Sequence, residues 1–336
     1  MAEAGLFGII GPNNLGGQAR DYVSLGITIE ELARADVSCA IICWLQATLS
    51  ALMPGWGDDT VRAVYRGDAL LALATSEADA GSDVSALQTR AQRDGDELIV
   101  TGRKIHVSLL PGATVMAVSA RIDTGSGKDP VSLVRVPCDA PGVRIVPMPQ
   151  MGMRAHQLGD VTLENVRIPA SAVMGADGAG KAVMYARYNV SRCLSPLAAV
   201  GAAEDTIERT IAFAREKSIF GRKLATNQAV SFQLVEHATR LTMAKLMAYR
   251  ALWMNDQGMN ATCEAAMAKW FGITSGVDAI AACLQIHGAN GYLEEFPLEQ
   301  RLRDVNGLQF TGGTINIMKL VLVREMIGRE FSGLSG

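Results

Sequence analysis

Two short segments combine hydroxyl, aromatic and small side chains in a way that could hold a planar, polar ligand. SEADAGSD places Ser76 and Ser82 among small residues, so backbone N–H groups can approach a ligand while the hydroxyls donate to it. In VTGRKIHVS, His106 and Ser108 are two positions apart, and alternation along a strand puts both on one face. A flat ring beside a hydroxyl could pack on a planar ligand and hydrogen-bond to its edge. A capped loop and a strand with one polar face are the simpler interpretations.

Two further segments could meet phosphate groups. Phe220-Gly221 forms a bend between predicted helices, and the basic residues around it could neutralise a pyrophosphate: Arg215, Lys217, Arg222 and Lys223. The Gly288–Gly291 turn ends another predicted helix, where exposed backbone amides could reach phosphate or ring oxygens. A charged helix end and a structural turn remain open as alternatives. For Arg303 and Asp304, which follow shortly, we expect a structural ion pair rather than a catalytic one.

The elements that carry these segments fall into three zones, and the first, residues 1–70, is predicted to be helical. Apolar spacing predicts a helix from Tyr22 to Arg34 and a second, buried helix that begins at Asp36. The stretch Val37 to Met53 has no charged residue, but it contains serine, glutamine and threonine and is short for a bilayer span. We therefore expect a buried helix and no membrane association.

The second zone, residues 71–175, is rich in Val, Ile and Thr between Gly, Pro and Asp, which predicts an antiparallel β domain. Asp94-Gly95 between two potential strands indicates a hairpin. The third zone, residues 176–336, returns to helical spacing, with an apolar stripe from Val230 to Ala248. Residues 261–285 are crowded with Ala, Gly and Ser, so that helix can pack closely. Four long helices in this zone would form a bundle, giving an α+β protein.

Composition narrows the functional class. The net charge of the 336-residue chain is −3, which argues against a nucleic-acid-binding face. The six cysteines form no CxxC pair and no secretory signal begins the chain, so we expect reduced thiols in a cytoplasmic protein. The four histidines are dispersed, and we expect no metal site.

Taken together and in order, these segments resemble the acyl-CoA dehydrogenases, FAD flavoenzymes that desaturate acyl thioesters. The resemblance extends from Gly5 to about Gly328, and its blocks are SEADAGSD, MGMRAHQLGDVTLENVRIP, FGRKLATNQ, QIHGANGY, RLRD and GGTINI. It implies a helical N-terminal domain, a central antiparallel β domain and a C-terminal four-helix bundle. It also implies a homotetramer or homodimer with FAD bound across a subunit boundary. Members of the family usually carry one or two helices before the GLFGII segment.

The resemblance implies partners as well as a fold. The substrate would be an acyl thioester on CoA or on a carrier protein, since both present the same pantetheine arm. Electrons would pass from FAD to an electron acceptor flavoprotein or to oxygen. Neither nucleic acid nor a membrane is expected as a partner.

The resemblance also implies roles for individual residues. Ser108 matches a threonine whose hydroxyl donates to flavin N5, and His106 stands in place of a tryptophan packed on the ring. Lys217 stands where an arginine reaches the FAD pyrophosphate of the neighbouring subunit. Asn189 and Arg192 match positions on the substrate side. The other positions that match cofactor contacts are Ser76, Ser82, Phe220, Gln228, Gln285, Gly288, Ala289, Thr314 and Asn316, and Ser82 and Gly312 also match positions near the thioester.

The acid that the family uses as its catalytic base is missing. Desaturation requires a base to remove the α proton while a hydride passes from the β carbon to flavin N5, and the base is a positioned carboxylate. Family members carry it directly before the Gly-Thr of the late loop or directly before the helix arginine. These positions are Gly312 and Ser191 here. Glycine has no side chain, and serine has little basicity unless another base activates it.

Other acids could substitute. Glu204 lies too far from Arg192, because twelve residues of helix span about 18 Å. Glu294 and Glu295, in the turn after Gly291, remain candidates, whereas Asp160 is expected to end a hairpin in the β domain. Three hypotheses follow: an acyl-thioester dehydrogenase with a relocated base; a same-fold flavoenzyme that needs no α-proton base, such as a desulfinase or an oxygenase; or a non-catalytic subunit of a mixed oligomer.

Overall fold

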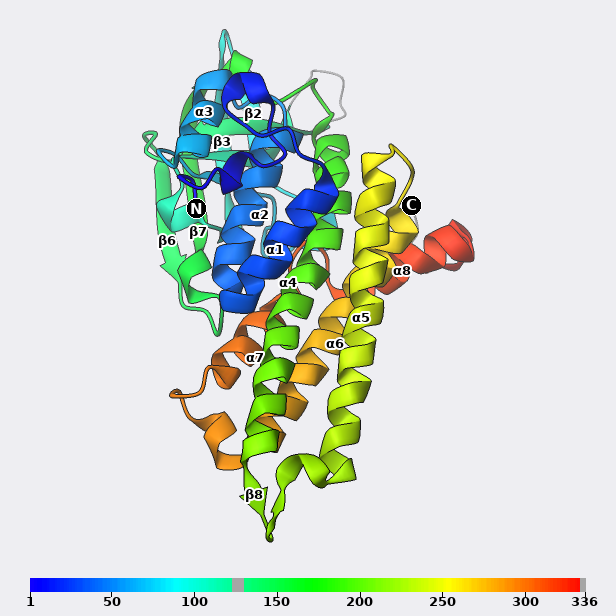
Figure 1. Cartoon of the computed structure of the whole chain (residues 1–336). Coiled ribbons are helices and arrows are strands. Elements are labelled where there is room, and N and C mark those ends of the chain that lie inside the picture. The colour runs from blue at the N-terminus through cyan, green and yellow to red at the C-terminus, as the bar shows by residue number, and fades with distance from the viewer. Residues whose placement is uncertain (123–129, 333–336) are drawn as a thin grey trace. The chain divides into compact units, whose positions relative to one another are not determined.

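A computed structural model describes residues 1–122 and 130–332 of the chain (Figure 1). The chain divides into two compact units. Unit 1 contains Met1–Arg20, Ile42–Gln150 and Ala155–Tyr188, and unit 2 contains Asp21–Ile41, Met151–Arg154 and the chain from Asn189 onward.

Unit 1 is built on one sheet. Its strands are β1 (Leu71–Ala74), β2 (Arg90–Asp94), β3 (Glu97–Ser108), β4 (Val115–Ile122), β5 (Val131–Pro137), β6 (Val143–Met148) and β7 (Leu158–Pro169). Their order is β1-β4-β2-β3-β7-β6, and β5 pairs with β4. The pairings are antiparallel, as predicted, except that β1 and β2 each run parallel to β4. The hairpin predicted at Asp94-Gly95 joins β2 to β3, and Gly95 adopts the left-handed conformation that this turn requires (φ 59°).

Two helices near the N-terminus confirm the interpretation of the first zone. α1 (Tyr22–Ala35) begins where the Asp21 side chain accepts from Ser24 N, and α2 (Val37–Leu52) follows directly. α2 is mostly buried, which confirms the buried helix predicted for the uncharged stretch. α3 (Asp58–Arg66) completes this region. Over the described ranges, no helix has both the length and the hydropathy to cross a bilayer.

Unit 2 is helical. Helix α4 (Gly180–Glu216) begins in unit 1 and belongs to unit 2 from Asn189 onward. The short strands β8 (Ser218–Ile219) and β9 (Arg222–Lys223) follow it. The long helices α5 (Gln228–Asp256) and α6 (Thr262–His287) come next. The shorter helices α7 (Leu298–Gly307) and α8 (Ile315–Met326) follow. In Figure 1, α4, α5 and α6 (green through orange) lie side by side. The C-terminal helical domain was predicted correctly, although α8, which contacts α6, has only 12 residues.

Close approach between helices of unit 2 depends on glycine. A Cβ on Gly201 of α4 would lie 2.2 Å from the Glu30 carbonyl oxygen of α1, and one on Gly272 of α6 would lie 2.6 Å from the Pro196 Cβ of α4. Gly272 of α6 therefore allows the close packing that was predicted from the abundance of Ala, Gly and Ser in residues 261–285. The α5 stripe was also predicted correctly, since Leu234, Leu241, Ala244 and Ala248 are buried.

Candidate functional site

The end of β3 is shaped by a bulge. The register of β3 with β7 shifts between Lys104 and Val107, and His106 takes a left-handed conformation (φ 55°). Because of this extra residue, Lys104 and Val107 are both buried although they are three positions apart. His106 is exposed and Ser108 is half-buried, so the two flank the buried Val107. The shared face expected from regular strand alternation stays a prediction, because the bulge interrupts the alternation at His106.

Asp160 stabilises the bulge. It lies within β7, opposite Val146 of β6, so the expectation that it ends a hairpin was wrong. Its carboxylate accepts from the His106 backbone N–H at 3.3 Å and from Arg103 at 2.9 Å. The Asp160 carboxylate therefore holds the bulged end of β3 in place.

A buried ion pair supports the loop that carries Ser76 and Ser82. Glu77 accepts from Lys104 Nζ at 2.7 Å, from the Thr89 hydroxyl at 2.6 Å and from the Gln88 N–H at 2.6 Å. Burial alone would raise the pKa of Glu77, but these donors outweigh it and hold the pKa below its usual value. The adjoining Ser76 is half-buried and its carbonyl accepts from Ile105 N at 2.9 Å, which ties the loop to β3. Ser82 is exposed.

In unit 2, the loop before α8 surrounds the position where the family carries an acid. Gly312 and Gly313 have φ values of 58° and 95°, so the backbone turns sharply here in a conformation that favours glycine. The Thr314 side chain caps α8 by accepting from Ile317 N at 3.3 Å. A Cβ built on Gly312 would have one neighbour within 4 Å, Lys269 Nζ at 3.8 Å.

Lys269 was not recognised from the sequence. It lies on α6, is 1% exposed, and its Nζ donates to the carbonyls of Thr311 and Gly313 on either side of Gly312. Burial, and then the charge of Arg192, lower the pKa of Lys269 to about 7. The position of the missing carboxylate therefore lies beside a buried amine that holds the loop. An ordinary lysine in an alanine-rich helix carries no signal for this role.

The second acid position lies on α4. Ser191 and the adjacent Arg192 are both buried, and Asn189 is half-buried. As the sequence indicated, neither of the two family acid positions, Gly312 and Ser191, carries a carboxylate.

Of the acids considered as substitutes for the missing base, Glu204 is in an ion pair, whereas Glu294 and Glu295 are exposed to solvent. Glu204 accepts from Lys245 at 2.7 Å, and Lys245 also pairs with Glu30 at 2.6 Å, so this cluster joins α1, α4 and α5. Glu294 and Glu295 are exposed in the segment after the turn at Gly288–Tyr292.

The basic turn and the end of α6 are on the surface of unit 2. Phe220 (φ 47°) and Gly221 (φ 78°) join β8 to β9, and the Phe220 side chain is fully exposed. The Gly288 N–H donates to the Gln285 carbonyl, so this amide of the predicted turn is not available to a ligand. The other predicted cofactor positions with exposed side chains in this unit are Lys217, Gln228, Gln285, Ala289 and Asn316.

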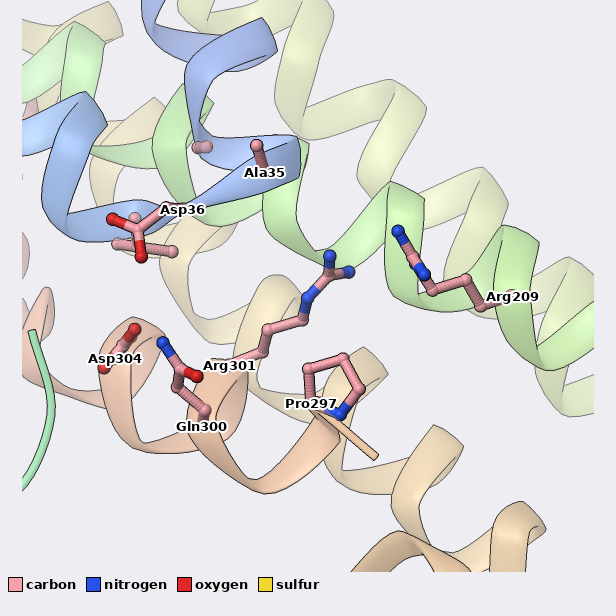
Figure 2. A pocket seen from close by; sticks show the side chains of 9 residues that line it. Ala35, Asp36, Arg209, Pro297, Gln300, Arg301 and Asp304 are labelled. Carbon is pink, nitrogen blue, oxygen red and sulfur yellow. The ribbon is translucent and has the colours of Figure 1, made fainter. Parts of the chain in front are cut away.

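The RLRD segment has a structural role, but its ion pairs differ from the prediction. Arg303 pairs with Glu299 at 2.6 Å rather than with Asp304, whose carboxylate accepts from Met153 N. Arg301 pairs with Asp205. Figure 2 shows Arg301 and Asp304 at a cavity of about 180 Å³ between α7 and the junction of α1 with α2. The charged groups of this segment therefore pair with or accept from other groups of unit 2.

No group of three His, Cys, Asp or Glu side chains suited to a metal ion occurs within residues 1–122 and 130–332. The six cysteines are free thiols. Among the predicted site residues, Ser76, Ser82, His106 and Ser108 belong to unit 1. Unit 2 contains Asn189, Ser191, Arg192, Gly312 and the remaining predicted cofactor contacts.

Three domain families match in succession: the acyl-CoA dehydrogenase N-terminal domain at residues 1–69, the middle domain at 72–166 and the C-terminal domain at 178–327. The chain therefore belongs to the acyl-CoA dehydrogenase family.

Individual relatives resemble nearly the whole chain. A probable acyl-CoA dehydrogenase of Bacillus subtilis, YngJ, is 31% identical over 97% of this chain and 88% of its own. A 3-(aryl)acrylate reductase of Clostridium sporogenes is also 31% identical, over 97% and 89%. The crystal structure of the prolyl acyl carrier protein oxidase AnaB superposes with a TM-score of 0.90, at 30% identity over 99% of this chain and 89% of that one.

Proposed function

We propose that this protein is an FAD-dependent oxidoreductase that transfers hydrogen at the α and β carbons of an acyl thioester. Membership of the acyl-CoA dehydrogenase family along almost the entire chain is the observation that carries this proposal. The relatives include a reductase and an oxidase as well as a dehydrogenase, so hydrogen transfer in either direction fits the family.

The residues of this chain fit FAD. Within the described residues, the hydroxyls of Ser76 and Ser108 make no hydrogen bond to the protein, although both side chains are half-buried at the end of β3 and the adjoining loop. Half-buried donors without a protein partner suit the polar edge of a flavin. We assign Ser108 to the flavin N5 edge, Ser76 to the pyrimidine edge and His106 to the face of the ring. When bound, FAD supplies the acceptor for the hydride.

The exposed residues of unit 2 fit the remainder of the cofactor. Lys217 provides a point charge for a pyrophosphate, and the fully exposed Phe220 provides an apolar surface with no cover from its own chain. We assign both to FAD held across a subunit boundary. Gln228, Gln285, Gly288, Ala289, Thr314 and Asn316 complete this assignment.

Assembly is supported by an exposed apolar stripe on α5. Phe232, Val235, Met243, Leu246 and Trp253 are each more than half exposed, and their spacing of three, seven or eight residues places them along one side of the helix. A patch of this kind on a protein that also exposes Phe220 favours burial against another copy. We propose a homotetramer in the cytoplasm, where the six thiols stay reduced.

The thioester is assigned to the loop and helix that carry the two vacant acid positions. By the family resemblance, we assign Asn189, Arg192 and Gly312 of unit 2 to the substrate side. Lys269 Nζ donates to the carbonyls of Thr311 and Gly313. Neither Gly312 nor Ser191 offers a carboxylate, so α-proton transfer requires an acid or base from elsewhere. Whether CoA or a carrier protein presents the acyl group, and whether a flavoprotein or oxygen accepts the electrons, depends on contacts outside this chain.

The vacant acid positions favour a second candidate. A same-fold flavoenzyme whose substrate has no α proton to remove, such as a sulfinyl thioester, would need no carboxylate at Gly312 or Ser191. A non-catalytic subunit beside an acid-bearing relative would equally tolerate both replacements.

Anaerobic mixing with thioesters separates these candidates. The FAD-loaded protein is mixed with saturated acyl-CoAs and with acylated carrier protein, and flavin absorbance is recorded. Bleaching by a saturated thioester is expected for the proposed function. Sulfite release from a sulfinyl thioester, substrate hydroxylation with oxygen, or activity that appears only after co-purification with a relative would replace it with the second candidate.

The Ser108 assignment has its own test. Ser108→Ala is expected to slow bleaching about 10²-fold, because a donor aimed at developing charge is lost, while FAD content stays unchanged. Ser108→Thr keeps the hydroxyl and should retain most of the rate. Equal rates for the alanine and threonine variants would remove Ser108 from the site.

A further inference from the structure

Arg187 on α4 is a buried cation without a counter-ion. Its side chain lies in unit 1 and the residue is 4% exposed. Nε donates to the Thr48 hydroxyl at 3.1 Å, whereas Nη2 is buried and has no hydrogen-bond partner. Among residues 1–122 and 130–332, no carboxylate forms an ion pair with it.

The contacts that Arg187 does make are neutral. Thr48 lies on α2, and its hydroxyl in turn donates to the Trp44 carbonyl at 2.8 Å. The residues next to these two along their helices belong to an apolar cluster that includes Leu49, Met184 and Tyr188. Burial therefore lowers the pKa of Arg187 to about 10 without an opposing carboxylate.

Lys104, another buried cation of unit 1, has a counter-ion. Lys104 is fully buried, and its Nζ lies 2.7 Å from Glu77 and 3.0 Å from the Ser119 hydroxyl. A buried charge without such partners is strongly unfavourable, so it is expected where a ligand supplies the missing charge. The contrast between Lys104 and Arg187 indicates a ligand for the second.

The position on α4 points to the acyl substrate. Ser191 and Ser195 follow Arg187 at intervals of four residues, and all three are buried. Residues four apart lie on one face of a helix, so α4 carries a row of buried polar groups. The Ser195 hydroxyl, like Arg187 Nη2, has no hydrogen-bond partner.

We propose that Arg187 binds a carboxylate on the acyl group of the substrate, so that the protein prefers thioesters of dicarboxylic acids over those of monocarboxylic acids. The guanidinium offers planar, paired donors that match a carboxylate, and with Nε held by Thr48 the outer nitrogens are left for the ligand. This inference rests on the proposed function, because it names the class of acyl group that the proposed thioester substrate carries. It involves binding only, with no covalent step.

The experiment compares matched thioesters. The FAD-loaded wild-type protein is titrated with CoA thioesters of straight-chain monocarboxylic acids and of dicarboxylic acids with the same number of carbons, and the change in the flavin spectrum gives Kd. A charge-assisted hydrogen bond changes affinity by about 10- to 100-fold, and we expect at least one dicarboxylic member to bind that much more tightly than its matched partner. Arg187→Met should abolish the difference by weakening only the dicarboxylic member, and Arg187→Lys should retain part of it.

Controls separate charge from position. Arg66→Met removes an exposed arginine of unit 1 that pairs with Asp68, and it should leave the preference unchanged. Without thioester, Arg187→Met should unfold at the same temperature as the wild type or higher, since it removes an uncompensated buried charge. A purely structural arginine would give a clear loss of stability instead.

Three results would overturn the inference. Equal affinities for matched pairs in the wild type would show that no carboxylate is recognised. An equal weakening of both classes by Arg187→Met would assign the residue to the fold. Stabilisation of the wild type, but not of Arg187→Met, by inorganic phosphate without any thioester preference would assign a free anion. If no thioester perturbs the flavin at all, the proposed function itself fails; perturbation by monocarboxylic thioesters alone rejects only the role of Arg187.

Discussion

Replacing Gly312 with glutamate would put a carboxylate where the family resemblance implies one, and the structure leaves room for a Cβ there. The nearest atom to a Cβ at this position is Lys269 Nζ at 3.8 Å, an ordinary contact distance. The left-handed backbone (φ 58°) disfavours a residue with a side chain by about 1–2 kcal/mol. The positive charge near the new carboxylate offsets part of this cost. We therefore expect Gly312→Glu to fold and to retain FAD.

The expected gain follows from the chemistry of the α proton. A positioned general base contributes about 10²- to 10⁴-fold to a rate, so flavin reduction by a saturated acyl thioester should accelerate by a factor in this range. The new glutamate should also raise the pKa of Lys269 from its value of about 7, because an opposite charge favours the protonated amine, while the amine lowers the pKa of the glutamate. The carboxylate is then ionised at neutral pH and able to accept a proton.

Anaerobic stopped-flow measurement of flavin bleaching provides the assay, with flavin content checked by absorbance. Gly312→Gln is the matched control, since glutamine has the same size and the same backbone strain but no basicity. The reasoning fails if the two variants bleach at the same rate while both retain FAD. In that case the acyl chain does not pass beneath this loop, or the native protein already supplies a competent base.

Two further predictions concern stability. Lys269→Met removes a lysine whose pKa is about 7 in the folded protein and 10.5 in the unfolded chain, so between these values the unfolded wild type holds more protons and its folding free energy improves as pH rises. Relative to the variant, the wild type should gain about 2 kcal/mol in free energy of unfolding between about pH 7 and about pH 9, as measured by denaturant unfolding. Lys181→Met, at an exposed position, should leave this pH dependence unchanged. If Lys269→Met keeps the pH dependence of the wild type, the charge of Lys269 is not buried. Gly201→Ala would place a Cβ 2.2 Å from the Glu30 carbonyl oxygen and should destabilise unit 2 by about 1–3 kcal/mol in thermal unfolding. Gly112→Ala, with only Leu70 Cδ1 at 3.8 Å, is its control, and equal unfolding temperatures for both variants would refute the close approach of α1 and α4.

The sequence was informative wherever a signal is local. The β2–β3 hairpin depends on Asp94-Gly95, and the buried helix α2 depends on the uncharged stretch that begins at Val37. Each is encoded by residues adjacent in the chain, and turn geometry is set within a few positions. The same holds for the vacancy at the acid position, which needs only the identity of one residue.

Some predictions failed because the relevant partner is distant in the sequence or is one of several choices. Arg303 was expected to pair with Asp304, but successive helical residues point in different directions, and Glu299 at i−4 is the reachable partner. Asp160 was expected in a turn, yet it lies opposite the β3 bulge and accepts from the His106 N–H. Strand pairing decides such roles, and pairing is not visible in a single strand.

Residue types and their order along the chain were sufficient to define the family and its α+β fold. Only the tertiary structure assigned special roles to Lys269 and Arg187. Each is a common basic residue within a helix, and its burial makes it unusual. The Lys269 amine of α6 lies beside Gly312. The Arg187 guanidinium donates to Thr48 of α2 and has no carboxylate partner among the described residues. The electrostatic state of a side chain depends on how much water is excluded and which charges remain nearby, and both are set by packing between segments far apart in the sequence.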